Sequence, residues 1–290
     1  MADKKRLLVR EALEGHLFSS PAFLLLFFIL FFPFIYVIYI SFFTKIFGYE
    51  AKFSGLNNYL EVLRDPLFHY SFYITLIYTI SAVILKLVIG LGFAILLSQK
   101  FKGHSVVRAI AVMPWGIPLF VIAAIFFWFF DYNLGLANLL LKNLFGVRNI
   151  LWLGPELVVL SIIYVNVWKG IPFFMVNFLS ALQTIPRELY EAAEIDGANS
   201  WQRFIHITIP SIKYVILLTC LLSTIWTFSE FDTIFYLTRG GPGYITHIIP
   251  IYIYFQAFSR FDIGMAAAAS VLTVPLFVTL IAVILWLLRR

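Results

Sequence analysis

Polar side chains recur at helical spacing inside a long apolar run near residue 225. Ser223, Trp226, Thr227 and Glu230 are three, one and three residues apart, which places them on one face of a helix. Such groups can hydrogen-bond a sugar's hydroxyls, while an indole ring covers its apolar face. Ser223 and Thr227 suit helix–helix contacts equally well, so both interpretations stay open. We expect Trp226 to lie on the substrate pathway. We also expect Glu230 on this pathway, close to its outer mouth or to a partner protein.

A second apolar run also carries polar and aromatic residues at helical spacing. We expect Asn166, Gly170 and Phe173 to line the same substrate pathway. Two lysines, Lys86 and Lys169, also lie within apolar runs, where a charge is expensive and usually functional. Lys86 is expected to face the protein interior, with a partner that the sequence does not identify. Lys169 is expected in the outer half of a pore or at a subunit interface.

The residues that carry most enzyme chemistry are scattered. The five histidines lie in separate segments without metal-ligand spacing: His16, His69, His104, His206 and His247. No nucleophile–base arrangement and no G-x-x-x-x-G-K-[ST] nucleotide motif occur in the sequence. The single cysteine, Cys220, excludes an intrachain disulfide. We therefore expect no catalytic residue, metal or cofactor on this chain.

Composition indicates an integral membrane protein. Hydrophobic residues make up 62% of the 290 residues and charged residues 12%, and 32 positions are Phe. Soluble domains are about a quarter charged, so this chain is far outside their range. Six apolar runs are long enough to cross a bilayer. They cover residues 20–43, 70–97, 107–130, 157–182, 214–236 and 265–288.

The distribution of positive charge predicts the orientation. Of the 21 lysines and arginines, twelve lie on the side of the N-terminus and seven on the opposite side. The positive-inside rule then places both termini in the cytoplasm, and this bias explains the net charge of +6 without nucleic acid. Residues 1–19 form the predicted cytoplasmic N-terminal segment and 20–290 the transmembrane domain. The run at 20–43 is too long for a signal-peptide core, and the segment 247–258 is too short to span and is expected to be interfacial or re-entrant.

A polar loop at about 183–211 joins the fourth and fifth runs. Glu188, Glu191 and Glu194 are three residues apart and share one helical face. Gly197 is a typical helix stop, and Asn199 or Ser200 can cap a second helix. The sequence therefore predicts a water-facing helix–turn–helix, although an ordinary cytoplasmic hairpin would also be polar.

The spacing within this loop carries a family resemblance. Glu191-Ala192-Ala193 is followed after three residues by Gly197, and after nine more by Ile207 and then Pro210. This pattern resembles the coupling loop of ABC importer permeases, with Ile209 where Leu is usual. The wider chain, from about residue 20 to the end, resembles their carbohydrate-uptake branch and its maltose-type first subunit.

The resemblance implies an all-α membrane protein with six transmembrane helices, N-in and C-in, of the type I ABC importer permease fold. It implies a multi-pass protein of a prokaryotic inner membrane that imports a di- or oligosaccharide by alternating access. Its partners would be a second permease subunit, an ABC ATPase dimer that binds ATP and Mg²⁺, an extracytoplasmic sugar-binding protein and membrane lipid. The residues implied to contact the ATPase are Glu191, Ala192, Ala193, Asp196, Gly197, Ile207 and Pro210.

Other functions remain open at this level. Within the family, the solute could be glycerol phosphate or another small polar molecule, but a sugar phosphate would favour basic residues, and Lys169 is the only fair candidate. A stand-alone secondary carrier would need intramembrane acids, and only Glu230 and Asp232 come close. A membrane enzyme such as a lipid-linked glycosyltransferase would need acidic or metal-binding motifs in its loops. Which sugar is carried and which chains are its partners are not specified by the sequence.

Overall fold

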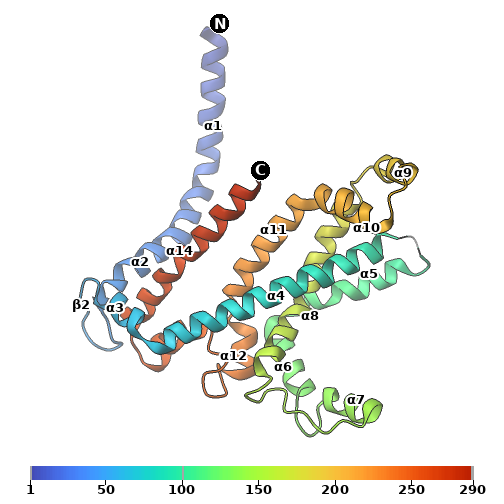
Figure 1. The fold of residues 1–290 in the computed structure, drawn as a ribbon. Helices are drawn as coiled ribbons and strands as arrows, with labels where there is room; N and C mark the ends of the chain where they lie inside the picture. The colour runs from blue at the N-terminus through green and yellow to red at the C-terminus, as the bar shows by residue number, and fades with distance from the viewer. Residues whose placement is uncertain (1, 100, 289–290) are drawn as a thin grey trace. The chain divides into compact units, whose positions relative to one another are not determined.

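The computed structural model describes residues 2–99 and 101–288, which are almost entirely helical (Figure 1). The chain divides into two compact units. The terminal unit comprises Met1–Asp65 with Ile253–Val274, and the central unit comprises Pro66–Tyr252 with Pro275–Arg290.

Within the described residues, five helices are long and apolar enough to cross a membrane. They are Glu14–Ser41, Pro66–Ser98, Val158–Leu182, Ser200–Phe228 and Ile263–Val283. A sixth span is present if the bent pair His104–Gly116 and Leu119–Phe129 counts as one. The predicted all-α membrane fold is confirmed, while the direction in which the chain crosses the membrane stays a prediction.

Two of these helices contain a π-helical turn just before a proline. In the terminal unit, α1 (Ala2–Leu26) continues through η1 (Phe27–Phe31) into α2 (Phe32–Ser41), which contains Pro33. In the central unit, α10 (Ser200–Arg203) continues through η3 (Phe204–Thr208) into α11 (Ile209–Phe228), which contains Pro210. A proline ring clashes with the carbonyl four residues earlier, and a π-turn relieves that clash. Pro210 therefore lies within one continuous helix, Ser200–Phe228.

The terminal unit is closed by a short hairpin. Strands β1 (Phe43–Thr44) and β2 (Lys52–Phe53) pair antiparallel and lead to α3 (Asn57–Arg64). The buried Asn58 amide donates hydrogen bonds to the carbonyls of Ser41 (2.8 Å) and Phe43 (2.9 Å). These bonds satisfy backbone groups at the end of the first span. Helix α3 itself buries Asn58 and Val62.

The central unit is built on α4 (Pro66–Ser98), α8 (Val158–Leu182) and α11, which pack against one another. Gly90 of α4 makes close approach possible, because a Cβ there would lie 2.5 Å from the Cβ of Phe174 on α8. The hydrophobic core on these helices includes Tyr78 of α4 and Ile162 of α8, both fully buried. This packing brings polar residues of three different helices to a common interior.

The predicted third span is not a straight helix. Residues 107–130 form α5 (His104–Val112), a 3-10 turn η2 (Met113–Gly116) and α6 (Leu119–Phe129), with a bend of 101°. Pro114 and Pro118 lack backbone N–H groups, and the residue before Pro118 is extended, as a following proline requires. These prolines break the helix in the middle of the apolar run.

The predicted fifth span, 214–236, is also broken. It begins earlier, in the continuous helix from Ser200, and α11 ends at Phe228. After Ser229–Phe231 the chain resumes as α12 (Asp232–Thr238), which packs against α6. Polar Ser229, Glu230 and Asp232 fall at this break and interrupt an otherwise apolar sequence.

The remaining helices are short. Three of them are α7 (Leu136–Phe145), α9 (Arg187–Ile195) and α13 (Ile249–Tyr254), which continues into the π-turn η4 (Phe255–Ser259). The exception is the final helix, α14 (Ile263–Leu288), which is long. The segment predicted as interfacial or re-entrant contains α13, whose six residues are indeed too few to span. It is largely buried, and Tyr252 packs edge-on against Phe68 of α4, with ring centroids 5.4 Å apart.

Candidate substrate cavity and coupling loop

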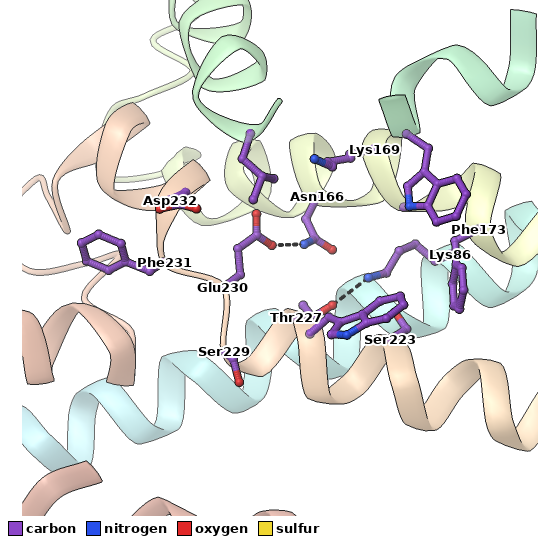
Figure 2. A pocket seen from close by; sticks show the side chains of 14 residues that line it. Lys86, Asn166, Lys169, Phe173, Ser223, Thr227, Ser229, Glu230, Phe231 and Asp232 are labelled. Atoms are coloured by element: carbon purple, nitrogen blue, oxygen red, sulfur yellow. Dashed lines mark hydrogen bonds between the residues drawn. The ribbon is translucent and has the colours of Figure 1, made fainter. Parts of the chain in front are cut away.

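A cavity of about 440 Å³ opens in the central unit where α4, α8 and α11 meet the two helix breaks (Figure 2). Every residue predicted for the substrate pathway lines it: Asn166, Gly170, Phe173, Ser223, Trp226, Thr227 and Glu230. Lys86, Trp115, Leu119, Lys169, Ser229, Phe231 and Asp232 complete the lining. The structure therefore brings the two predicted helical faces together, while their contact with a substrate stays a prediction.

Glu230 is held in the cavity wall by two other helices. The Tyr78 hydroxyl of α4 donates a hydrogen bond of 2.7 Å to its Oε2. The Asn166 amide of α8 donates to the same oxygen, as Figure 2 shows. A carboxylate in an apolar region needs such partners to remain stable. Glu230 therefore lies in the cavity wall, and its position near the outer mouth or a partner stays a prediction.

The partner of Lys86, which sequence reasoning leaves unnamed, is Thr227. The Lys86 side chain is buried, and its Nζ donates to Thr227 Oγ1 over 2.8 Å. Gly170 makes room for the lysine stem, because a Cβ at that position would collide with Lys86. The observed position of the Lys86 side chain therefore requires a glycine at residue 170.

Lys169 lies at the bend of the third span. Its Nζ donates a hydrogen bond of 3.2 Å to the carbonyl oxygen of Ile117, the residue that follows η2. Carbonyl groups at the end of a helix carry partial negative charge, which a lysine stabilises. Lys86 holds a comparable position, since its partner Thr227 is in the last turn of α11. Each lysine thus lies beside the end of a broken span.

Aromatic rings form one wall of the cavity. The ring centroids of Trp115 and Phe173 are 6.1 Å apart, and those of Phe173 and Trp226 are 4.9 Å apart. Trp226 leaves about half of its surface exposed. A wall of this kind offers flat apolar surface opposite the polar groups of Asn166 and Glu230.

Sequence reasoning missed the cavity residues that flank the helix breaks. Trp115 and Leu119 lie on either side of the bend in the third span, and Ser229, Phe231 and Asp232 lie at the break before α12. The pair of prolines at 114 and 118 was a signal that could have located the first break. The second break has no proline or glycine to mark it.

The coupling loop, residues 183–211, is a helix–turn–helix, as predicted. Helix α9 ends at Ile195, and Gly197 follows with a φ of +79°, which glycine adopts without strain. The N–H of Ala198 donates to the carbonyl of Ala193 (2.8 Å), and that of Gly197 to the carbonyl of Glu194 (3.0 Å). These two bonds form a Schellman motif, which closes the helix at this point.

Local contacts make this loop a compact unit. Asn199 caps α10 and forms a reciprocal capping box with Gln202, which confirms one of the two predicted caps. Glu194 of α9 forms an ion pair with Arg203 of α10. The Tyr190 hydroxyl lies 2.9 Å from the Thr208 hydroxyl. Two side-chain contacts therefore hold α9 against the N-terminal part of the helix Ser200–Phe228, which forms the fifth span.

The outer surface of the coupling loop is open. Glu191, Ala192, Asp196, Gly197 and Pro210 are exposed, whereas Ala193 and Ile207 are half-buried. Four large apolar side chains of the loop are also exposed, led by Ile195 (87%) and Trp201 (67%) and followed by Leu189 and Ile205. In Figure 1, α9 lies at the opposite end of the central unit from α7 and α12. Exposed apolar groups bordered by acids are typical of a protein-binding surface.

Residues suited to a metal are not clustered. Across residues 2–99 and 101–288, no group of three His, Cys, Asp or Glu side chains could hold an ion.

Comparison with known proteins places the chain in a family. Residues 86–290 match the family described as binding-protein-dependent transport system inner membrane component. The chain is 37% identical to the trehalose/maltose transport system permease protein MalF of Thermococcus litoralis, over 92% of this chain and 91% of that protein. It is 35% identical to the sulfoquinovosyl glycerol transport system permease protein SmoG of Agrobacterium fabrum, over 96% of this chain and 91% of that protein.

A solved structure shares the fold. A chain from the crystal structure of a bacterial ABC transporter involved in the import of the acidic polysaccharide alginate superimposes with a TM-score of 0.81 and 22% identity. The match covers 97% of this chain and 96% of that chain. The protein is therefore a multi-pass inner-membrane component of the binding-protein-dependent transport family, the permease subunit of an ABC importer.

Proposed function

We propose that this permease subunit carries a sugar, a di- or oligosaccharide, across the membrane and holds it transiently in the cavity at Trp226 and Asn166. Relatives named for trehalose/maltose, sulfoquinovosyl glycerol and diacetylchitobiose support a carbohydrate. The observation that carries the proposal is the cavity's composition: an aromatic wall faces amide, hydroxyl and carboxylate groups across about 440 Å³.

The cavity matches the two-sided chemistry of a sugar ring. A pyranose presents C–H groups on one face and hydroxyls around its edge, and Trp226 with Phe173 offers a flat surface for the former. Asn166, Ser223 and Glu230 offer hydrogen-bonding partners for the latter. The volume is at the small end of the range for small-molecule sites, so it suits one or two sugar units at a time.

We further propose that the coupling loop docks on a cytoplasmic ATPase subunit. Glu191, Asp196 and the exposed Ile195 would enter a cleft on that partner, with Ala192 and Ala193 permitting close approach. The remaining predicted contacts, Gly197, Ile207 and Pro210, shape the loop and its junction with α11. Because α9 is fastened to the fifth span through Tyr190 and Glu194, movement of the partner would move α11 as well.

The assembly proposed around this chain contains a second permease subunit, an ATPase dimer that binds ATP and Mg²⁺, and an extracytoplasmic sugar-binding protein. ATP-driven closure of the ATPase dimer would switch the permease between outward-open and inward-open states. The proposed orientation has both termini and the coupling loop in the cytoplasm.

The test is uptake by the complete importer reconstituted in vesicles, with radiolabelled maltose, trehalose and chitobiose as separate probes. Trp226→Ala should raise the KM for the transported probe about tenfold, because stacking on an aromatic ring is worth roughly 1 kcal/mol or more. The matched control is Trp128→Ala, an exposed tryptophan on α6 that does not line the cavity. Uptake of none of the probes by the assembled importer, or equal effects of the two variants, would overturn the proposal.

A further inference from the structure

A second cavity of about 440 Å³ lies in the central unit between α6, α7 and α8. Ser161 and Tyr164 of α8 line it, whereas Gly170 and Phe173, nine residues further along in each case, line the cavity that we propose for a sugar. Nine residues make two and a half helical turns, so the two pairs lie on opposite faces of α8. The two cavities are therefore separate and can take different ligands.

The lining of the second cavity is suited to hydrocarbon. Apart from Ser161, every residue that lines it is apolar or aromatic. The Ser161 hydroxyl is already engaged, because it donates a hydrogen bond of 2.7 Å to the carbonyl oxygen of Trp152. The Trp152 ring stacks on Phe130, with ring centroids 5.6 Å apart. A sugar would find few hydrogen-bonding partners here, whereas an acyl chain would lose only its contact with water.

A buried polar network fixes two walls of this cavity. Asn138 of α7 is only 2% exposed, and its amide donates to the carbonyls of Tyr132 (3.1 Å) and Ile150 (2.9 Å). Its Oδ1 accepts hydrogen bonds from the Ile150 N–H and from Nε1 of Trp152, both over 3.0 Å. These bonds hold α7 and Trp152 in place, so the cavity is formed before a ligand enters.

Helix α7 lies at a membrane surface. It belongs to the segment that joins α6, part of the bent span, to α8, and Figure 1 shows it at the end of the central unit remote from α9. The helix exposes several large apolar side chains, among them Leu136, Leu144 and Phe145. Such a surface is unfavourable in water and typical of a helix that lies in the interfacial layer of a bilayer.

Two cations accompany this apolar surface. Lys142 and Arg148 are the only charged residues between positions 132 and 155. Both are exposed, and neither side chain has a hydrogen bond or ion pair with the residues that the structure describes. The chain turns back on α7 between them, where the Val147 N–H donates to the Leu141 carbonyl (3.5 Å). Free cations next to an apolar cavity match an anionic group that carries hydrocarbon.

We propose that the cavity between α6, α7 and α8 binds an acyl chain of an anionic phospholipid, whose phosphate lies against Lys142 and Arg148. The bilayer around α6 and α8 supplies such molecules. The aromatic side chains of the cavity, Trp152 and Tyr164, are of the kind that concentrate at the boundary between hydrocarbon and headgroups. The bound lipid anchors α7 to the leaflet remote from the coupling loop.

The test is photolabelling of the complete importer in phosphatidylcholine vesicles. The probes are phosphatidylglycerol and phosphatidylcholine, each with a photoreactive group at the end of one acyl chain and used separately. Labelled peptides are identified by mass spectrometry and normalised to the exposed first span, Glu14–Ser41, which reports general lipid contact. Peptides from α7 and the start of α8 should be labelled at least about fivefold more by the phosphatidylglycerol probe.

Variants separate the charge from the cavity. Lys142→Gln/Arg148→Gln should reduce the preference for phosphatidylglycerol to less than about twofold. Leu140→Trp fills the cavity and should lose most of the labelling by either probe. The matched control is Leu144→Trp, an exposed leucine of the same helix that does not line the cavity, which should be labelled like the wild type. If the Leu140→Trp importer does not assemble, Leu160→Trp fills the cavity from α8.

Three outcomes would overturn the lipid site. The first is equal labelling of these peptides by the two probes in the wild type, and the second is unchanged labelling in both cavity-filling variants. The third is labelling in the isolated permease chain but not in the complete importer, which would assign this surface to a protein partner. None of these outcomes affects the sugar cavity on the other face of α8.

Discussion

The coupling loop and the substrate cavity use charged residues in opposite ways. In the loop, Glu191 and Asp196 are exposed to solvent, where a charge is stable without a partner. In the cavity, Lys86 is buried and Glu230 is partly buried, and each is hydrogen-bonded to another helix. The first arrangement suits a surface that exchanges water for a protein partner, and the second suits a site that must remain stable inside a membrane.

The two regions also differ in how far apart their bonded residues are in sequence. Glu194 and Arg203 are 9 residues apart, and Tyr190 and Thr208 are 18 apart. Lys86 and Thr227 are 141 residues apart, and Tyr78 and Glu230 are 152 apart. The loop can therefore keep its shape when the spans move, whereas any movement of α4 against α11 changes the cavity. This difference is what alternating access requires of a coupling element and of a binding site.

The largest expected effect concerns the side of the membrane on which the loop lies. In a Cys220→Ser background, Ile195→Cys should react with a membrane-impermeant thiol reagent only when the reagent has access to the cytoplasmic face of the membrane. Tyr49→Cys, in the exposed hairpin of the terminal unit, should react only from the outside. Both positions should label almost completely from one side and not from the other. Labelling of both from the same side would contradict the proposed orientation.

Gly197→Pro tests whether the loop's shape matters for partner binding. Proline requires a φ near −65°, which is incompatible with the +79° observed, so the turn after α9 cannot form. The variant should insert normally, lose at least about tenfold in co-purified ATPase and lose uptake to a similar degree. Gly48→Pro removes an exposed glycine with a φ of +84° from the hairpin and should retain the ATPase. Full ATPase retention by Gly197→Pro would remove the loop's assigned role.

Gly90→Ala tests the packing on which the cavity depends. The added methyl group would lie 2.5 Å from the Cβ of Phe174 and force α4 away from α8, at a cost of about 2 kcal/mol. Thermal unfolding of the purified chain should occur several degrees lower, with weakened sugar binding. The control is Gly92→Ala, two residues along α4, where nothing lies within 4 Å. That variant should be neutral or slightly stabilised, because alanine favours helix. Equal stability of the two variants would contradict the packing described.

The smallest expected effect is at the contact between α9 and the fifth span. Tyr190→Phe removes the hydroxyl that lies 2.9 Å from the Thr208 hydroxyl and should weaken the loop by about 1 kcal/mol. Coupled uptake should fall a few-fold at constant ATPase activity, since the partner still docks but moves α11 less effectively. Tyr214→Phe, an exposed tyrosine on α11, serves as the control. A proportional fall in both uptake and hydrolysis would indicate lost docking instead.

What the sequence could predict follows from how local each interaction is. A helical face is a local property, so the spacing of Ser223, Trp226, Thr227 and Glu230 correctly grouped residues that share the cavity. The turn at Gly197 and the cap at Asn199 are local too, and both form as expected. The pairing of Lys86 with Thr227 depends on how α4 and α11 pack, which no local pattern encodes. The break after Phe228 was missed for a related reason: no proline or glycine marks it, and α12 is defined by its packing against α6.

The most direct test of the account is a structure of the assembled importer with the disaccharide that it takes up trapped during transport. The account predicts sugar density in the cavity, with one ring against Trp226 and Phe173 and a hydroxyl donating to Glu230 Oε1. The same structure should show α9 seated on the ATPase subunit. Sugar density bound wholly by other subunits, with this cavity empty in every state, would contradict the central claim.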